Sequence, residues 1–280
     1  MAIDSRKLVE RVIDQIEHLP TLPHVVGNLL AMTESPNVDA TKLSKALDQS
    51  LAAKVLKVAN SAFYGQRKVN TISQGIVIIG FDVVKEIILT TSLFHTFHDA
   101  RDIQALQPLW QHSLECAMIA KRLGWIYRYE ILDEAYFSGL IHDIGKLVIQ
   151  QYFPEPHEQI RKLVEEGVER LDAEKQILSI THAEIGGKMV QRWNFPAALV
   201  DAVSHHHDQD WKLNPRLGRI LYYANLFVLG WVDFTQMLAA MSNAGMSMPG
   251  NWDSVDLQGV EEILHQEIEK AHSMFQISGT

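Results

Sequence analysis

The sequence predicts an all-α protein, because its apolar residues recur at helical spacing and only one short segment suggests a strand. In the first half, Leu43, Leu47, Leu51 and Val55 follow one another at the spacing of one face of a helix. The second half repeats this pattern at Leu217, Ile220/Leu221, Ala224 and Val228. The candidate strand, Gly75–Gly80, is too isolated to predict a sheet.

The first hundred residues are predicted to form helices joined by short turns. The segment Leu19-Pro20-Thr21-Leu22-Pro23 favours an extended entry into a helix over residues 24–33. The next helix has Asp39 as its N-cap and ends at the turn Asn60–Gly65, where a glycine provides the exit.

The apolar segment Gly75–Gly80 is interpreted as a short helix packed on all sides, because Asp82 then restarts a helical pattern. Nothing in this half indicates chemistry. A helical packing module and a groove for a peptide or effector both remain open.

The second half is predicted to contain further helices. They cover residues 108–123, a buried segment at 135–141, a helix opening at His182, a helix from Ala197 into the histidine run, and the repeat at 217–228. A loop over 241–253 precedes a final amphipathic helix ending near Phe275. The polar stretch His95–Pro108 divides the chain, giving expected segments of 1–100, 101–240 and 241–280.

Composition excludes several classes of protein. The chain has 280 residues and is 47% hydrophobic, which is enough for a sizeable core. A net charge of -9 argues against nucleic-acid binding through a broad positively charged surface. Its apolar runs are shorter than the roughly 20 residues of a membrane span, and the first residues lack a signal-peptide core. The lone Cys116 excludes an internal disulfide, so we expect a cytoplasmic protein.

The segment His142-Asp143-Ile144-Gly145-Lys146 is the most informative part of the chain. An imidazole and a carboxylate follow directly on the buried segment 135–141, where both are costly unless something binds them. On a continuous helix the two side chains point about 100° apart, so a shared metal would lie between them. Gly145 permits the close approach of another backbone or of a phosphate. Lys146 is positioned to meet an anion, and a plain helix C-terminus is the alternative for the whole segment.

Further histidines are candidate metal ligands. His112 faces the predicted core, although a core histidine bonded to a carbonyl would look the same. His182 opens a helix, where an exposed N-terminal histidine is the alternative. In the run His205-His206-His207, the spacing favours His206 as the inward residue, with one or two of the others meeting solvent. Five His/Asp positions on inward-facing segments predict a divalent metal site.

The order of His112 and His142-Asp143 resembles the HD superfamily of metal-dependent phosphohydrolases, and His-Asp-Ile-Gly-Lys resembles the HD-GYP phosphodiesterases. The whole chain is most similar to the HDOD (HD-related output domain) family. The matching segments are 19–23, Ala53–Ala62, Ile72–Gly80, the His-Asp segment, His182–Gly186 and His206-His207-Asp208.

This resemblance implies an N-terminal helical bundle packed on an HD-like helical domain, with a role in bacterial signal transduction. It implies a metal set of His112, His142, Asp143, His182, His206, His207 and the residue at position 225. Active HD enzymes carry aspartate at that last position, where this chain has Asn225. A neutral amide weakens metal binding. The Gly-Tyr-Pro of the phosphodiesterases is also missing after the histidine run.

Two functions therefore remain open. The first is a regulatory module with a retained but impaired metal site and signalling proteins as partners. The second is a phosphohydrolase in which Asp143 and Lys146 act on a phosphorylated small molecule or nucleotide through a metal-activated water. A His-rich site with one carboxylate suits Fe, Mn, Ni or Zn, and a nucleic-acid partner or a membrane is not expected.

Overall fold

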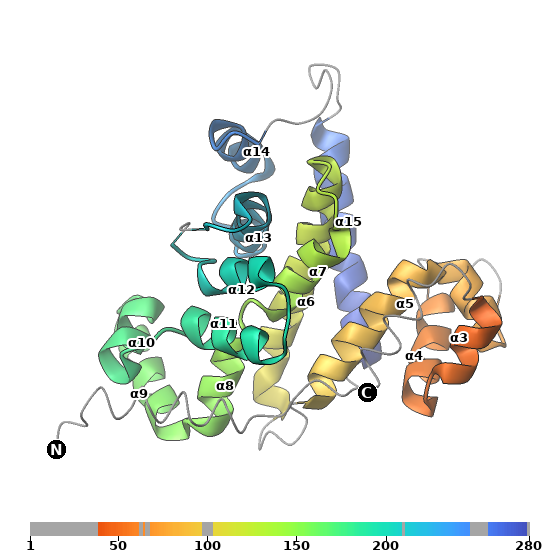
Figure 1. Cartoon of the computed structure of the whole chain (residues 1–280), viewed down its shortest axis with the longest axis horizontal. Coiled ribbons are helices and arrows are strands. Elements are labelled where there is room, and N and C mark those ends of the chain that lie inside the picture. The colour runs from red at the N-terminus through yellow and green to blue at the C-terminus, as the bar shows by residue number, and fades with distance from the viewer. Residues whose placement is uncertain are drawn as a thin grey trace. The chain divides into compact units, whose positions relative to one another are not determined.

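The computed structural model describes residues 39–61, 64, 68–96, 103–208, 211–246 and 257–278, and every regular element within them is an α-helix (Figure 1). The all-α prediction is therefore confirmed. The helix and extended entry expected before residue 39 lie outside the described residues. No helix in the described part of the chain is both long and apolar enough to cross a membrane.

The described chain divides into two compact units. One contains α3 (Ala40–Ala46), α4 (Gln49–Ala59) and α5 (Ile72–Thr96), together with the part of α15 (Leu257–Ser278) that follows Leu264. The other holds the remaining helices: α6 (Ile103–Ile126), α7 (Leu132–Ile141), α8 (Ile144–Tyr152), α9 (Pro154–Glu165), α10 (Arg170–Leu178), α11 (His182–Arg192), α12 (Ala197–Ser204), α13 (Pro215–Val228) and α14 (Phe234–Asn243).

The apolar periodicity of the first unit is divided between two helices rather than carried by one. Asp39 caps α3 as predicted, with its side chain accepting from the Lys42 amide at 2.8 Å. Asp48 then caps α4 by accepting from the amide of Leu51. A carboxylate that bonds the amide three residues ahead favours a helix start over a helix interior, so the chain turns at Asp48.

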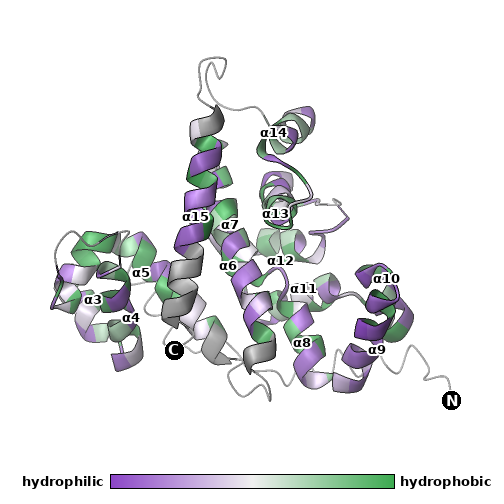
Figure 2. Cartoon of the chain, turned by 180° about the vertical axis from the view of Figure 1, so that it is seen from behind, coloured by the Kyte–Doolittle hydropathy of each residue, from purple (hydrophilic) through white to green (hydrophobic). Residues whose placement is uncertain are grey.

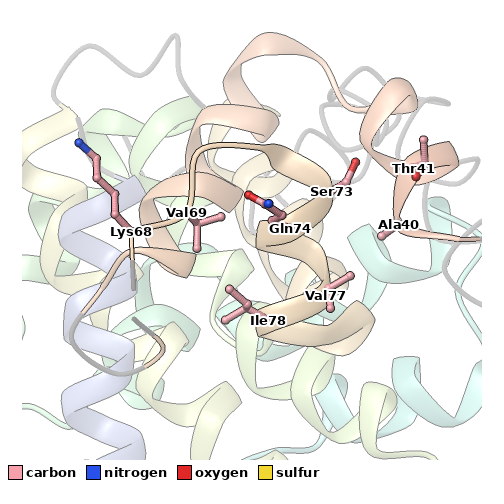
Figure 3. Close-up of a pocket in the computed structure, with 8 residues that line it drawn as sticks. All are labelled: Ala40, Thr41, Lys68, Val69, Ser73, Gln74, Val77 and Ile78. Carbon is pink, nitrogen blue, oxygen red and sulfur yellow. The ribbon is translucent and has the colours of Figure 1, made fainter. Parts of the chain in front are cut away.

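The segment 75–80 is helical, as predicted, but it is not packed on all sides. It forms the first part of α5, and Gly80, with φ 82°, interrupts the helix before it continues. Val77 and Ile78 are 73% and 45% exposed. They line a hollow of about 470 Å³ whose other walls are Ala40, Thr41, Lys68, Val69, Ser73 and Gln74 (Figure 3).

The second unit is built around α6 and α7, which lie against each other along their buried faces. All residues from Ala135 to Ile141 are buried, which confirms the interpretation of that segment. Gly139 permits the close approach, because a Cβ there would lie 2.6 Å from the Ala117 backbone. The α6 helix begins at Ile103 rather than at Pro108, so that proline lies inside the helix.

Four more helices complete the surroundings of the cluster described below. α13 packs on α6 and α7, while α11 packs on α8 and α12. Figure 2 shows hydrophilic and hydrophobic residues interspersed along these helices, as expected where each buries only part of its surface. α14 extends to Asn243, so the helix continues into the start of the predicted loop; residues 247–256 lie outside the description.

Candidate metal centre

The His142-Asp143 pair lies at a break between two helices, not within one. α7 ends at Ile141, His142 keeps helical angles, and Asp143 (φ -95°, ψ 10°) precedes the first residue of α8. The helix C-terminus, which was the alternative for this segment, is what the structure contains at His142, and a second helix follows directly after Asp143. Because of the break, the side chain of Asp143 points in a different direction from one on a continuous helix. Asp143 is only 1% exposed.

Asp143 is the centre of a cluster of buried side chains. Its Oδ1 lies 3.2 Å from Nε2 of His182 and 3.6 Å from Nε2 of His206. Its Oδ2 lies 3.4 Å from Nε2 of His142 and 3.7 Å from Nε2 of His112. The two carboxylate oxygens thus face two different pairs of imidazoles.

Hydrogen bonds at Nδ1 fix the orientation of three of these rings. His142 Nδ1 donates to the Gly139 carbonyl at 2.8 Å, and His206 Nδ1 donates to the Val203 carbonyl at 2.7 Å. Nδ1 of His182 lies 2.7 Å from Oε2 of Glu174 and donates to it. Each carbonyl or carboxylate can only accept, so Nδ1 carries the proton and Nε2 presents its lone pair to Asp143.

Glu174 was not singled out from the sequence, although it is fully buried. Its Oε2 accepts from both the backbone amide and the ring of His182. The hydrogen bond from His182 holds the carboxyl pKa below its usual value, although burial alone would raise it. It lies in the charged stretch Arg170-Leu-Asp-Ala-Glu-Lys175, where a solvated helix face is the ordinary interpretation, so no local signal marked it.

Replacement of Glu174 by glutamine is expected to weaken any metal held by His182 by about 10- to 100-fold, since the amide no longer fixes the ring and its basicity. Metal titration followed by competition with a chelator measures this change. Arg170→Gln is the control on the same helix. It removes a cation whose Nη1 lies 3.7 Å from Oε1 of Glu174 but leaves the hydrogen bond from His182 to Glu174 in place. Equal affinity in Glu174→Gln and wild type would contradict the role.

The remaining predicted residues also lie at the cluster or beside it. His207 is half-buried, and its Nε2 is 3.0 Å from Nε2 of His182. His205 points away, pairing with Asp208 in a partly exposed position. Asn225 is 5% exposed, and its Oδ1 accepts from the thiol of Cys116 at 3.9 Å. Spacing had favoured His206 as the inward residue of the run, and the fully buried side chain agrees.

Lys146 forms the shortest of these polar contacts. Its Nζ lies 2.6 Å from Oδ2 of Asp143 and the side chain is 25% exposed. Burial alone would raise the pKa of Asp143, but the electrostatic effect of the neighbouring His142 and Lys146 outweighs it, so the pKa lies well below its usual value. The carboxylate is therefore ionised at neutral pH.

Three imidazoles, those of His112, His206 and His207, are neutral under the same conditions. Burial, with the nearby His142, lowers the pKa of His112 to about 4, and burial is also the main reason that the pKa of His206 falls to about 4. Burial together with His206 and His182 lowers the pKa of His207 to about 2. Neutral imidazoles and an ionised carboxylate are the protonation states that metal binding requires.

These shifts predict an acid-sensitive fold for the metal-free protein. Between about pH 6.5 and pH 4, the unfolded chain binds protons at His112 and His206 that the folded chain does not, so stability falls as the pH falls. The loss is on the order of 3 kcal/mol for each histidine. Urea unfolding of chelator-treated protein at both ends of this range measures it. His206→Gln should lose its share of the pH dependence, and an unchanged slope would contradict the assignment.

Three polar atoms of the cluster are buried and have no hydrogen-bond partner among the described residues: His142 Nε2, Asp143 Oδ1 and His206 Nε2. Buried polar atoms are rarely left in this state, and each of these presents a lone pair to the cluster. Four candidate ligand atoms, from Asp143, His182, His206 and His207, lie within 4.8 Å of one another. A second group within the same limit comprises His112, Cys116 and His142. The residues present therefore fit a divalent metal ion.

Gly145 permits the close approach of another backbone segment, which is one of the two roles predicted for it. A Cβ at this position would lie 1.9 Å from the carbonyl oxygen of His182 and 3.0 Å from the amide nitrogen of Gly186. The start of α8 and the start of α11 are consequently in direct backbone contact. This contact holds His182 at its distance from Asp143.

The fold and this cluster define the chain as an all-α protein with an HD-type group of buried histidines around one aspartate. The HDOD domain model matches residues 19–209, and the chain belongs to the HDOD family. An uncharacterised protein of Treponema pallidum (strain Nichols) is 26% identical over 73% of this chain, which spans 40% of that relative's length.

Solved structures share the fold. A candidate phosphohydrolase from Shewanella amazonensis SB2B is 24% identical with a TM-score of 0.75, covering 95% of this chain and 97% of that one. An HDOD domain protein from Geobacter sulfurreducens is 22% identical with a TM-score of 0.68, covering 98% and 95%. A candidate signal transduction protein from Marinobacter aquaeolei VT8 is 21% identical with a TM-score of 0.67, covering 98% of this chain and 65% of its own.

Proposed function

We propose that this protein is a signal-transduction module that retains an HD-type divalent metal site without efficient turnover. The observation that carries the proposal is the group of buried polar atoms without partners at the cluster, Oδ1 of Asp143 with Nε2 of His142 and of His206, together with a neutral amide at position 225. The similar structure from Marinobacter aquaeolei is named for signal transduction, which supports the regulatory role. The partners would be signalling proteins in the cytoplasm.

In this proposal the metal is held by Asp143, His182, His206 and His207, whose donor atoms lie closest together. His112, His142 and Asn225 stand on the other side of the carboxylate. A bound divalent ion would supply Lewis acidity and an acidified water. The protein's own contribution is the fixed orientation of the rings through Gly139, Val203 and Glu174. Fe, Mn, Ni and Zn all suit this mixture of imidazole and carboxylate.

Asn225 is the reason for proposing weak turnover. Its side chain is buried and engaged with Cys116, and it adds no negative charge to the cluster. Asp143 is then the one carboxylate that faces the imidazoles. A second cation beside its Oδ2 would find too little negative charge from oxygen ligands to balance its own charge. A metal-activated water at this site would then be less well oriented for attack.

A phosphohydrolase is the second candidate, and Lys146 favours it. Its ammonium group lies beside the cluster and is 25% exposed, which suits an anion arriving from solvent. The similar structure from Shewanella amazonensis is named as a candidate phosphohydrolase. In this function Asp143 and Lys146 would act on a phosphorylated small molecule or nucleotide.

Metal analysis and turnover assays separate the two functions. The purified, untagged protein is analysed for Fe, Mn, Ni and Zn, then assayed with each ion against phosphomonoesters, phosphodiesters and cyclic dinucleotides. Bound metal without turnover supports the regulatory module. Bound metal with turnover that disappears in His206→Gln supports the hydrolase. Absence of metal, even after incubation with each ion, would overturn both.

A further inference from the structure

The lone cysteine of the chain lies inside the cluster. Cys116 is fully buried on α6, one helical turn after His112, and its Sγ is 3.6 Å from Nε2 of that histidine. The same sulfur lies 3.9 Å from Oδ1 of Asn225 on α13. The function proposed above makes no use of this thiol.

The neighbouring His142 gives an independent reason to expect a ligand here. The residue is fully buried, and its Nδ1 is occupied by the Gly139 carbonyl. Its Nε2 has no hydrogen-bond partner within the described chain and faces the same side of Asp143 as His112. One ring nitrogen of His142, Sγ of Cys116 and one ring nitrogen of His112 all lie within 4.8 Å of one another.

Three distances within this group lie near the edges of a tetrahedral zinc site. Zinc bonds of about 2.3 Å to sulfur and about 2.0–2.1 Å to nitrogen place those two ligands about 3.6 Å apart, and two nitrogen or oxygen ligands about 3.3 Å apart. Sγ of Cys116 and Nε2 of His112 are 3.6 Å apart. Oδ2 of Asp143 completes the set, at 3.4 Å from Nε2 of His142 and 3.7 Å from Nε2 of His112.

We infer that Cys116 is a ligand of a second metal position, formed with His112, His142 and Oδ2 of Asp143, which takes zinc. The inference rests on the proposed function, because Asp143 is also a ligand of the metal that was assigned there to His182, His206 and His207. When the ion binds, the thiol proton leaves to solvent and a metal–sulfur bond forms. The set of one thiolate, two imidazoles and one carboxylate selects zinc over the harder ions that oxygen ligands prefer.

In this arrangement Asn225 is the residue that allows Cys116 to bind the metal as a thiolate. A carboxylate at position 225 would bring a second negative charge to about the distance that now separates Oδ1 from the sulfur, 3.9 Å, and would repel a thiolate. The neutral amide instead accepts from the thiol. The thiolate of Cys116 on α6 thus takes the place of the carboxylate that active HD enzymes carry on α13. The negative charge on this side of Asp143 is the same in both arrangements.

Lys146 is the group that a second ion must displace. Its ammonium occupies Oδ2 of Asp143 at 2.6 Å and supplies a positive charge there. The side chain is partly exposed and unbranched, so it can turn toward solvent when zinc arrives. Lys146→Gln removes this competitor and is expected to tighten the second ion by at least about tenfold.

X-ray absorption at the zinc edge tests the inference on the full chain loaded with two equivalents of Zn²⁺. The expected spectrum contains a sulfur shell at about 2.3 Å beside nitrogen and oxygen at about 2.0–2.1 Å. Because the chain has one cysteine, a thiolate shell identifies Cys116. Two bound ions should fall to one in Cys116→Ser, whereas Met118→Leu, which removes a neighbouring buried sulfur on α6, should change nothing.

The outcomes separate this inference from the proposed function. Zinc bound without a sulfur shell overturns the Cys116 site and leaves the proposed function intact. No bound zinc overturns the Cys116 site, whereas the proposed function falls only if Fe, Mn and Ni also fail to bind. If Cys116→Ser fails to fold, the wild-type spectrum still decides. The double variant Cys116→Ser/Asn225→Asp adds a rescue: it should recover the second ion with oxygen in place of sulfur, and failure to recover it would contradict the exchange of charge between the two positions.

Discussion

Replacement of Asp143 by alanine is expected to abolish metal binding and with it all metal-dependent stabilisation. The carboxylate contributes Oδ1 to the group with His182 and His206 and Oδ2 to the group with His142 and His112. Without it, neutral imidazoles alone face a divalent cation. No second carboxylate among the described residues meets the ring nitrogens from this side, since Glu174 is bonded to the outer nitrogen of His182.

Thermal or urea unfolding with and without added metal measures this effect. A ligand at 100 times its dissociation constant stabilises the folded state by about 2.7 kcal/mol, and we expect that increment in the wild type but not in Asp143→Ala. Elemental analysis of the same samples should show metal in the wild type alone. Asp172→Ala, which removes an exposed carboxylate from the first turn of α10, should retain both properties.

Retention of metal by Asp143→Ala would contradict the shared role of this residue. The ion would then have to be held by imidazoles alone, and His207 with His182 would be the remaining pair in close approach. The metal-free samples show whether Asp143→Ala loses metal because it lacks a ligand or because it does not fold. If the ligand is the reason, the metal-free variant should still unfold cooperatively.

The sequence predicted the parts of the centre that local pattern determines. The buried segment 135–141, the helix opening at His182 and the inward position of His206 all follow from apolar spacing. Each depends only on neighbours within one or two helical turns, where periodicity is informative. The same reasoning left open whether the helix continues through Asp143 or ends beside it, and it did not predict that a second helix starts directly after the break.

Contacts between helices were beyond that reasoning. Glu174 and the thiol of Cys116 reach the centre from segments that look ordinary by themselves, one a charged helix and the other an apolar one. Val77 and Ile78 were expected in the core because of their composition, but no described segment covers that face of α5. Which apolar face is covered depends on tertiary packing, and a single segment does not encode it.

Gly145→Ala is expected to destabilise the protein by about 3 kcal/mol or more and to disturb the metal centre as well. An added Cβ would lie 1.9 Å from the carbonyl oxygen of His182, so the starts of α8 and α11 must separate. The obstacle is backbone on both sides, and no rotation of a side chain relieves it. His182 then moves away from Oδ1 of Asp143, which it now approaches to 3.2 Å.

Gly124→Ala is the matched control for this substitution, since it adds the same methyl group to a helix in the same unit. There the nearest atom is Cδ2 of Leu132 at 3.2 Å, the end of a side chain that can shift, and alanine favours the helix by up to about 1 kcal/mol. Urea unfolding and metal affinity of both variants provide the comparison. A Gly145→Ala protein with wild-type stability and affinity would mean that the two helix starts are not held by this contact, and the position of His182 would need another explanation.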